Sequence, residues 1–246
     1  MMTQQKLITK PTIITKPQPP ARLTLNIPDV DQLIPCFKPG DFATLHGTPS
    51  LITPFITRIC VRAQIPTQHG GLTSNVVFID GGDTFRQHKI THTAQQHKLD
   101  PRKVLKHIFV TKTFTAYELT AQITEKLEET IKKHKAKIVI ISDIAKTFLD
   151  ENIPEEEAQN VYSQILNYLT SFAKKHQIIL ITTYIQHNNT KRNTKLKETT
   201  LTKTNINIAF TKTLYTSEIE LEKHPTYILG IADYQTENTT LTNFIN

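Results

Sequence analysis

Short apolar runs alternate with longer amphipathic stretches along most of the chain. Runs rich in Val, Ile and Leu occupy 76–80, 138–143 and 178–183, and the first two end in a carboxylate, Asp80 and Asp143. Continuous β-branched runs of this length are typical of strands that are buried on both faces of a sheet. We therefore expect a buried strand at each of the three positions.

The segments between these runs have a helical period. The clearest, 117–134, places Leu119, Ile123, Leu127 and Ile131 four residues apart. Further helices are predicted at 55–65, 87–96 and 155–176, shorter strands at 41–45 and 108–110, and antiparallel, hairpin-like strands at 205–215, 217–222 and 226–232. Strands that alternate with helices predict an α/β fold: a largely parallel central sheet with helices on both faces and a C-terminal antiparallel extension.

Residues 1–22 have a different composition from the rest of the chain. They hold four prolines and repeat the word Ile-Thr-Lys-Pro at 8–11 and 14–17. This composition predicts a flexible, proline-rich arm ahead of one core domain, 23–246. An alternative is that the β-prone stretch 12–15 adds a strand to a neighbouring subunit or partner, so that the chain oligomerises through the arm.

The formal net charge of +7 and a pI near 9.3 favour a polyanionic partner, or serve solubility alone. No apolar run approaches the roughly 18 residues of a membrane span, so we expect no membrane partner and an intracellular protein. The two cysteines, Cys36 and Cys60, have no metal-ligand spacing, and the same is true of His88, His92 and His97. No metal site is predicted.

Residues 46–53 lie where a phosphate loop would connect the strand at 41–45 to the following helix. Such a loop has the pattern G-x-x-x-x-G-K-[ST], in which glycines admit the phosphates, Lys contacts them and a hydroxyl contacts Mg²⁺. Here Leu51 and Ile52 occupy the positions of the second Gly and the Lys, and only the hydroxyl of Thr53 is retained.

The stretch Gly70-Gly71, followed by Val-Val-Phe-Ile-Asp-Gly-Gly-Asp-Thr-Phe-Arg at 76–86, resembles the core of the RecA/RadA recombinases. Segments 63–66, 100–105 and 140–143 are also similar, and the likeness extends over 28–246. The resemblance implies a RecA-like ATPase core. The family's small N-terminal helical domain has no counterpart before this core, so the chain is similar to short archaeal paralogues of the RadB type.

The resemblance also assigns the ATPase positions. Ile52 occupies the position of the phosphate-loop Lys, and Gly82 occupies that of the water-activating Glu. We therefore expect a pseudo-ATPase that does not hydrolyse ATP. The Mg²⁺-organising carboxylate is retained as Asp143, unless that residue only caps the end of its strand. Weak binding of ATP and Mg²⁺ through Thr53 and Asp143, with Arg86 stacked on adenine, stays open; otherwise no cofactor is expected.

Two further segments correspond to the family's DNA-binding loops. The first carries five carboxylates, Asp150, Glu151 and Glu155–Glu157, which would repel a phosphate backbone, so we do not expect it to bind DNA as in the recombinases. The carboxylates suit the acidic first turn of a helix or, alternatively, an acidic surface for a basic partner. The second, 187–204, is predicted to be a mobile polar loop, because it contains few apolar residues. Its cations are expected either to follow a single-stranded DNA backbone or simply to be solvated; they are Lys191, Arg192, Lys195, Lys197 and Lys203.

These expectations describe a non-catalytic recombinase paralogue in homologous recombination and DNA repair. It would bind single-stranded DNA, a recombinase or another paralogue, and so assist or regulate the filament. The family's Phe-x-x-Ala word for polymerisation does not occur in 1–27. Two alternatives are a protein adaptor that does not touch DNA, and a weak ATPase that uses Asp83 and a Lys such as Lys38 from a neighbouring subunit.

Overall fold

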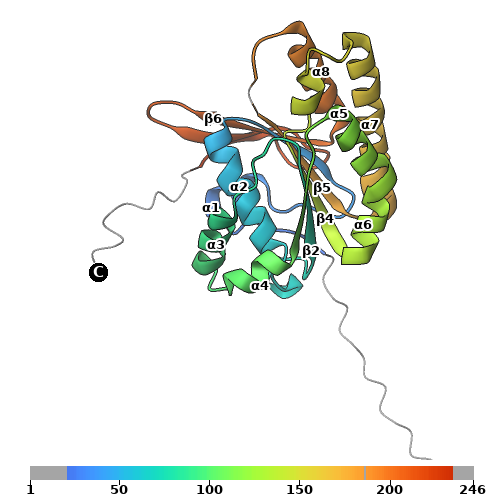
Figure 1. Ribbon diagram of the computed structural model, residues 1–246. Coiled ribbons are helices and arrows are strands. Elements are labelled where there is room, and N and C mark those ends of the chain that lie inside the picture. The colour runs from blue at the N-terminus through green and yellow to red at the C-terminus, as the bar shows by residue number, and fades with distance from the viewer. Residues whose placement is uncertain (1–20, 186, 235–246) are drawn as a thin grey trace, which may run out of the picture.

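One eight-stranded sheet forms the centre of the molecule (Figure 1). The computed structural model describes residues 21–185 and 187–234. The strands are β1 (Phe42–Gly47), β2 (Asn75–Asp80), β3 (Ile108–Lys112), β4 (Ala136–Ser142), β5 (Ile179–Ile185), β6 (Ile206–Lys212), β7 (Ser217–Lys223) and β8 (Gly230–Asp233). Their spatial order is β3-β2-β4-β5-β1-β6-β7-β8. Neighbours from β3 to β6 pair in parallel, whereas β7 and β8 extend the sheet antiparallel.

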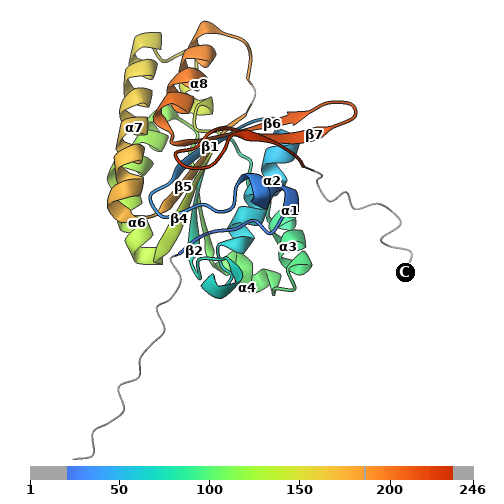
Figure 2. The same cartoon turned by 180° about the vertical axis from the view of Figure 1, so that it is seen from behind.

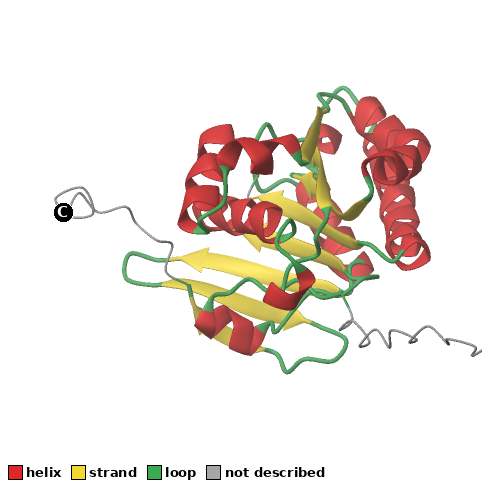
Figure 3. Cartoon of the chain, turned by 90° about the horizontal axis from the view of Figure 1, so that it is seen from below, coloured by secondary structure: helices red, strands yellow, loops and turns green. Residues whose placement is uncertain are grey.

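Helices cover both faces of this sheet (Figures 2 and 3). They are α1 (Pro28–Leu33), α2 (Pro49–Arg62), α3 (Gln87–Gln96), α4 (Pro101–Lys106), α5 (Ala116–Ala121), α6 (Leu127–His134), α7 (Glu155–His176) and α8 (Lys191–Lys203). The first four pack on one face and the last four on the other. This layered arrangement is the predicted RecA-like α/β fold with its antiparallel extension.

The alternation of side chains along each strand creates two separate cores. In β2, Val76 and Phe78 face the α1–α4 side, whereas Val77 and Ile79 face the α5–α8 side. Because side chains alternate between the faces of a strand, a run that is apolar at every position buries both faces. The buried runs that the sequence predicted are therefore explained by helices on both sides.

Several elements differ from the sequence-based expectations: α1 and α4 were not predicted, and β8 begins at Gly230, four residues later than expected. The helix predicted at 117–134 is present, but a π-helical turn at Gln122–Lys126 separates α5 from α6. Helix α2 begins at Pro49, six residues earlier than predicted. The segment 187–204, predicted to be a mobile loop, forms α8.

Most of the predicted arm lies outside the described residues, and of 1–22 only Ala21 and Arg22 are described. Ala21 packs against the core cluster on the α1–α4 side, and Leu23 forms an isolated bridge to Phe37. None of the helices in the described ranges is long and apolar enough to cross a bilayer.

Candidate functional site

The junction between β1 and α2 is where a phosphate loop would lie. A single residue, Thr48, separates the last residue of the strand from Pro49, the first residue of the helix. Proline is favoured at this first helical position, because it lacks an N–H group that the helix would leave unpaired. The N–H groups of Leu51 and Ile52 bond to the Thr48 carbonyl at 3.1 and 3.2 Å. Backbone donors that would face phosphates in a loop are therefore used by the helix.

The side chains at this junction also fill the space. Ile52 is 3% exposed and Leu51 is 1% exposed. A cavity of about 30 Å³ remains, lined by Thr53 and Arg86 among others. That volume holds one or two water molecules. The structure thus brings two predicted nucleotide ligands to one small cavity, in which Thr53 Oγ1 donates to the Pro49 carbonyl at 2.9 Å.

The turn after β2 is organised by the buried carboxylate of Asp80. Its Oδ1 accepts from Thr84 N at 2.8 Å and from Ser142 Oγ at 2.6 Å, and its Oδ2 accepts from Phe85 N at 3.1 Å. Hydrogen bonds from backbone N–H groups and a hydroxyl satisfy this carboxylate, which is 1% exposed. In this chain the Asp-x-x-x-Thr-Phe motif that carries the family resemblance therefore stabilises the turn after β2.

The position of the family's activating glutamate has no room for a side chain. A Cβ added to Gly82 would lie 2.6 Å from Asp143 Cβ, closer than such atoms approach in folded proteins. The neighbouring Asp83 is exposed, and Lys112 Nζ donates to its Oδ1 at 2.6 Å. This hydrogen bond to Lys112 lowers the pKa of Asp83.

Asp143, which follows the last residue of β4, is held by contacts with His187 and Thr183. It is completely buried, has a left-handed φ of 46°, and accepts from His187 Nε2 through Oδ1 at 2.8 Å. Its backbone N–H donates to Thr183 Oγ1 at 2.8 Å. Asp143 does not line the small cavity beside Thr53, so the two predicted Mg²⁺ ligands do not share a site.

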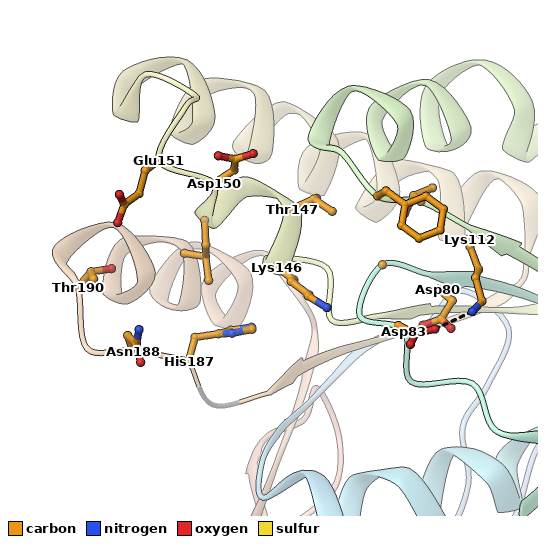
Figure 4. Close-up of a pocket in the computed structure, with 14 residues that line it drawn as sticks. Asp80, Asp83, Lys112, Lys146, Thr147, Asp150, Glu151, His187, Asn188 and Thr190 are labelled. Carbon is orange, nitrogen blue, oxygen red and sulfur yellow. Dashed lines mark hydrogen bonds and ion pairs between the residues drawn. The ribbon is translucent and has the colours of Figure 1, made fainter.

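A larger cavity of about 780 Å³ lies at the carboxyl ends of β2, β3 and β4 (Figure 4). Lys112 and Lys146 reach toward it from one side, and Asp150 and Glu151 stand at the other end. The sequence analysis did not predict that these charged residues line one cavity. Parallel pairing of the strands at 76–80 and 108–112 would have indicated it, because this pairing places Lys112 beside Asp80 at the carboxyl ends of both strands.

Two hydroxyls in the wall of this cavity, on Thr113 and Thr147, are buried without a hydrogen-bond partner among the described residues. The volume is in the range of ligand pockets. No residue of β1 or α2 belongs to the lining, so the cavity is separate from the phosphate-loop position.

Helix α8 overturns the prediction of a mobile polar loop. The Thr190 side chain accepts from Asn193 N and caps the first turn. Leu196 is buried in the core cluster beneath α7, and Thr200 Oγ1 lies 2.6 Å from the Tyr162 hydroxyl of α7. A cap and two buried contacts to a neighbouring helix order a segment whose own apolar content is low.

The two oppositely charged segments of the sequence lie against each other. Arg192 donates to the backbone carbonyls of Asp150 and Ile153, and Lys195 Nζ lies 3.2 Å from Glu155 Oε1. The hydrogen bond from Lys195 lowers the pKa of Glu155. Of the five predicted DNA-contacting cations, two are thus engaged with the acidic segment. Lys191 and Lys197 are exposed, and Lys203 is partly exposed.

Comparison with known proteins agrees with the fold. The model of the Rad51 family matches residues 51–206. The chain belongs to the Rad51 family. It is similar to the DNA repair and recombination protein RadA of Aeropyrum pernix, with 31% identity over 115 residues, which are 45% of this chain and 35% of the relative. RadA of Cenarchaeum symbiosum is 26% identical over 122 residues, which are 50% of this chain and 30% of the relative. The matches therefore span about a third of the length of these relatives.

Family membership raises the question of whether ATP and Mg²⁺ fit this chain. The position between β1 and α2 has no loop, no Lys and only about 30 Å³ of space. Within the described ranges, no group of three or more His, Cys, Asp or Glu side chains is placed to hold a metal ion. The residues present therefore do not fit a nucleoside triphosphate with its metal in the family's manner.

Proposed function

We propose that this chain is a non-catalytic member of the Rad51 family that assists or regulates strand-exchange filaments in recombination and repair. It would act through its surfaces, on single-stranded DNA and on a recombinase or another paralogue, without turnover of ATP. The observation that carries the proposal is the start of α2 at Pro49, one residue after β1. A helix in place of the loop withdraws the backbone donors that would cradle phosphates.

The surroundings of the junction support the same conclusion. Ile52 cannot contact a γ-phosphate, and contact with Asp143 excludes a side chain at Gly82. A charge-assisted hydrogen bond of the kind that Lys makes contributes about 1.5–3 kcal/mol. The chain therefore lacks the two groups that, by the resemblance, would hold the γ-phosphate and activate water for in-line attack. In the weak-ATPase alternative, Asp83 would have to give up Lys112 to act as the base.

The relatives named above are DNA repair and recombination proteins, and this supports the proposed process. The larger cavity lies between the segment after β4 and the start of α8, the two segments that the resemblance assigns to DNA contact. Lys191 and Lys197 remain available on α8 for a phosphate backbone. Binding of this kind is independent of sequence and strongly dependent on salt.

The test is the fluorescence anisotropy of a labelled single-stranded oligonucleotide at low and at near-physiological salt, with and without Mg²⁺–ATP. We expect binding that weakens steeply with salt and is unchanged by ATP. Phosphate release would be measured in parallel at high protein concentration. Release that is abolished by Asp143→Asn would contradict the non-catalytic assignment and support the ATPase alternative.

An adaptor function without DNA is favoured by exposed aromatic residues beside an edge strand. Phe114 and Tyr117 are 75% and 66% exposed, and they follow β3, which is the last strand on its side of the sheet. Exposed aromatic groups next to an unpaired strand edge are typical of protein contacts. Absence of oligonucleotide binding at low salt, together with tight binding of a recombinase that Phe114→Ser abolishes, would support this alternative.

A further inference from the structure

A further concentration of positive charge lies along α3 and α4, away from α8. From Arg86 to Lys106 the sequence has six Lys and Arg residues and one carboxylate, Asp100. The six cations are all exposed; they are Arg86, Lys89, Lys98, Arg102, Lys103 and Lys106. We call this the α3–α4 basic surface. It accounts for most of the chain's formal net charge of +7.

Almost none of this charge is neutralised within the protein. Arg86 has a distant partner, with Nη2 at 4.0 Å from Asp83 Oδ2. Among the described residues, no ion pair is found for the other five cations. By contrast, Lys195 on α8 pairs with Glu155 and Lys132 on α6 pairs with Glu128. On α8 and α6 carboxylates therefore neutralise part of the positive charge, whereas on the α3–α4 basic surface the one ion pair found among the described residues is the distant one of Arg86.

The spacing of these cations places several on one face. Arg102 and Lys106 are four residues apart on α4, with Lys103 between them, and Val104 on the opposite side is buried. Like charges four apart destabilise a helix slightly. The helix dipole explains cations in the last turn of α4, but it does not explain Lys89 or Arg102, which lie in first turns. A polyanion bound along this face would remove the repulsion.

A groove runs beside the same helix. Its volume is about 350 Å³, and its lining includes Thr73, Asn75, Lys103 and His107 together with one carboxylate, Asp100. His107 Nδ1 donates to the Lys103 carbonyl at 2.7 Å, which fixes the ring at the groove. Hydroxyl, amide and ammonium groups around a groove are the donors that commonly contact phosphate oxygens.

The apolar residues of the surface indicate which polyanion fits. The large exposed hydrophobic side chains lie on β3, at the start of α5, at the β6–β7 turn and around β8, and none of those found lies between Arg86 and His107. Protein interfaces are centred on buried aromatic or aliphatic anchors. A cationic face without such an anchor is suited instead to a sugar–phosphate backbone, where charge supplies most of the affinity.

We infer that the α3–α4 basic surface is a binding site for the phosphate backbone of a nucleic acid. This surface is separate from α8: in both views α4 lies at the bottom of the molecule and α8 at the top (Figures 1 and 2). This inference rests on the proposed function for its DNA-binding part. It adds a second surface, so that one molecule would make two separate contacts with nucleic acid.

The test compares three charge variants of the full chain with the unmodified protein. The first carries Lys89→Gln, Arg102→Gln and Lys106→Gln on the basic surface. The matched control carries Lys126→Gln, Lys133→Gln and Lys174→Gln, which remove the same charge from the exposed side of the α5–α8 layer. The third carries Lys191→Gln and Lys197→Gln on α8. All of the positions are exposed, so unfolding midpoints should match that of the unmodified chain.

Anisotropy with single-stranded and with duplex oligonucleotides is then measured over a salt series. The two arms distinguish the two sources of the same phosphate chemistry, and a loss in either arm supports the assignment. We expect the first variant to bind at least about tenfold more weakly at low salt. The slope of log K against log salt should flatten by about 2 for a single strand, because each lost contact removes about 0.7.

Three results would overturn the inference. Equal losses in the first variant and in the matched control would show an effect of net charge alone. A loss confined to the α8 variant would leave α8 as the DNA contact, so that the proposed function stands while this surface is excluded. Absence of binding by the unmodified chain at low salt would contradict both the surface and the DNA-binding part of the proposed function.

Discussion

The start of α2 and the turn after β2 are the two regions that the family resemblance assigns to one nucleotide site, and they depart from that assignment in different ways. At the first, the backbone itself is different, because α2 begins at Pro49 and no loop remains. At the second, the turn is intact around Asp80, although the residue that would activate water is Gly82. The first region has a helix where the resemblance places a loop, and the second has an ordered turn with a glycine where the resemblance places a glutamate.

This difference separates two kinds of family residue. Asp80 satisfies backbone N–H groups inside the protein, so its role does not depend on a ligand. A phosphate loop, by contrast, directs its backbone N–H groups at a bound anion. Once Leu51 and Ile52 are buried, a helix satisfies the same backbone groups without any ligand. Motif similarity in this chain therefore reports the fold more reliably than the chemistry.

The largest expected effect comes from restoring the family's lysine by Ile52→Lys. Because Ile52 packs in the core, the free energy of unfolding should fall by about 3 kcal/mol, through lost packing and a buried ammonium group. Denaturant titration measures the loss. Ser50→Lys, at an exposed position in the same turn, is the matched control and should leave stability nearly unchanged. A stable Ile52→Lys protein that gains Mg²⁺–ATP binding would show that the β1–α2 junction can still hold a nucleotide, which would contradict the account of this region.

Asp80→Ala should have the next largest effect. Removal of the carboxylate leaves the N–H groups of Thr84 and Phe85 and the Ser142 hydroxyl without their acceptor, at a cost of about 2–3 kcal/mol. Thermal unfolding measures the change. Asp83→Ala is the control, because that carboxylate is exposed and pairs only with surface cations. If both variants were equally stable, Asp80 would not organise the turn.

Gly82→Ala should have the smallest effect of the three. A Cβ at this position meets Asp143 Cβ at 2.6 Å, so the turn must shift, and we expect a loss of about 1–2 kcal/mol. In the control, Gly230→Ala, the added atom meets only Leu33 Cδ1, at 3.4 Å, and stability should hold. An unchanged Gly82→Ala protein would mean that the turn can accept the family's glutamate.

Much of the fold follows from local pattern. The runs at 76–80, 138–143 and 178–183 correspond to β2, β4 and β5, and the hairpin-like segments correspond to β6, β7 and β8. Burial on both faces of a parallel strand leaves a continuous apolar run, which is visible without any knowledge of distant contacts. Helix α7, predicted at 155–176, agrees for the same reason, because its own period is amphipathic.

Two of the differences, helix α8 and the early start of α2, have a common physical cause. Helix α8 depends on the cap at Thr190 and on contacts of Leu196 and Thr200 with α7. The early start of α2 depends on the burial of Ile52 beneath the sheet. Both are tertiary effects on segments of weak local preference, and pattern alone does not record them. The small volume beside Thr53 is equally invisible in sequence, because it is set by packing between distant elements.

The central claim is that this family member works without nucleotide, and a calorimetric titration of Mg²⁺–ATP into the full chain tests it most directly. The account predicts no saturable heat of binding, and no rise of the unfolding temperature at saturating ATP, because a ligand that binds the native state must stabilise it. Stoichiometric binding that is lost in Asp143→Asn and in Thr53→Val would contradict the account and identify a working nucleotide site.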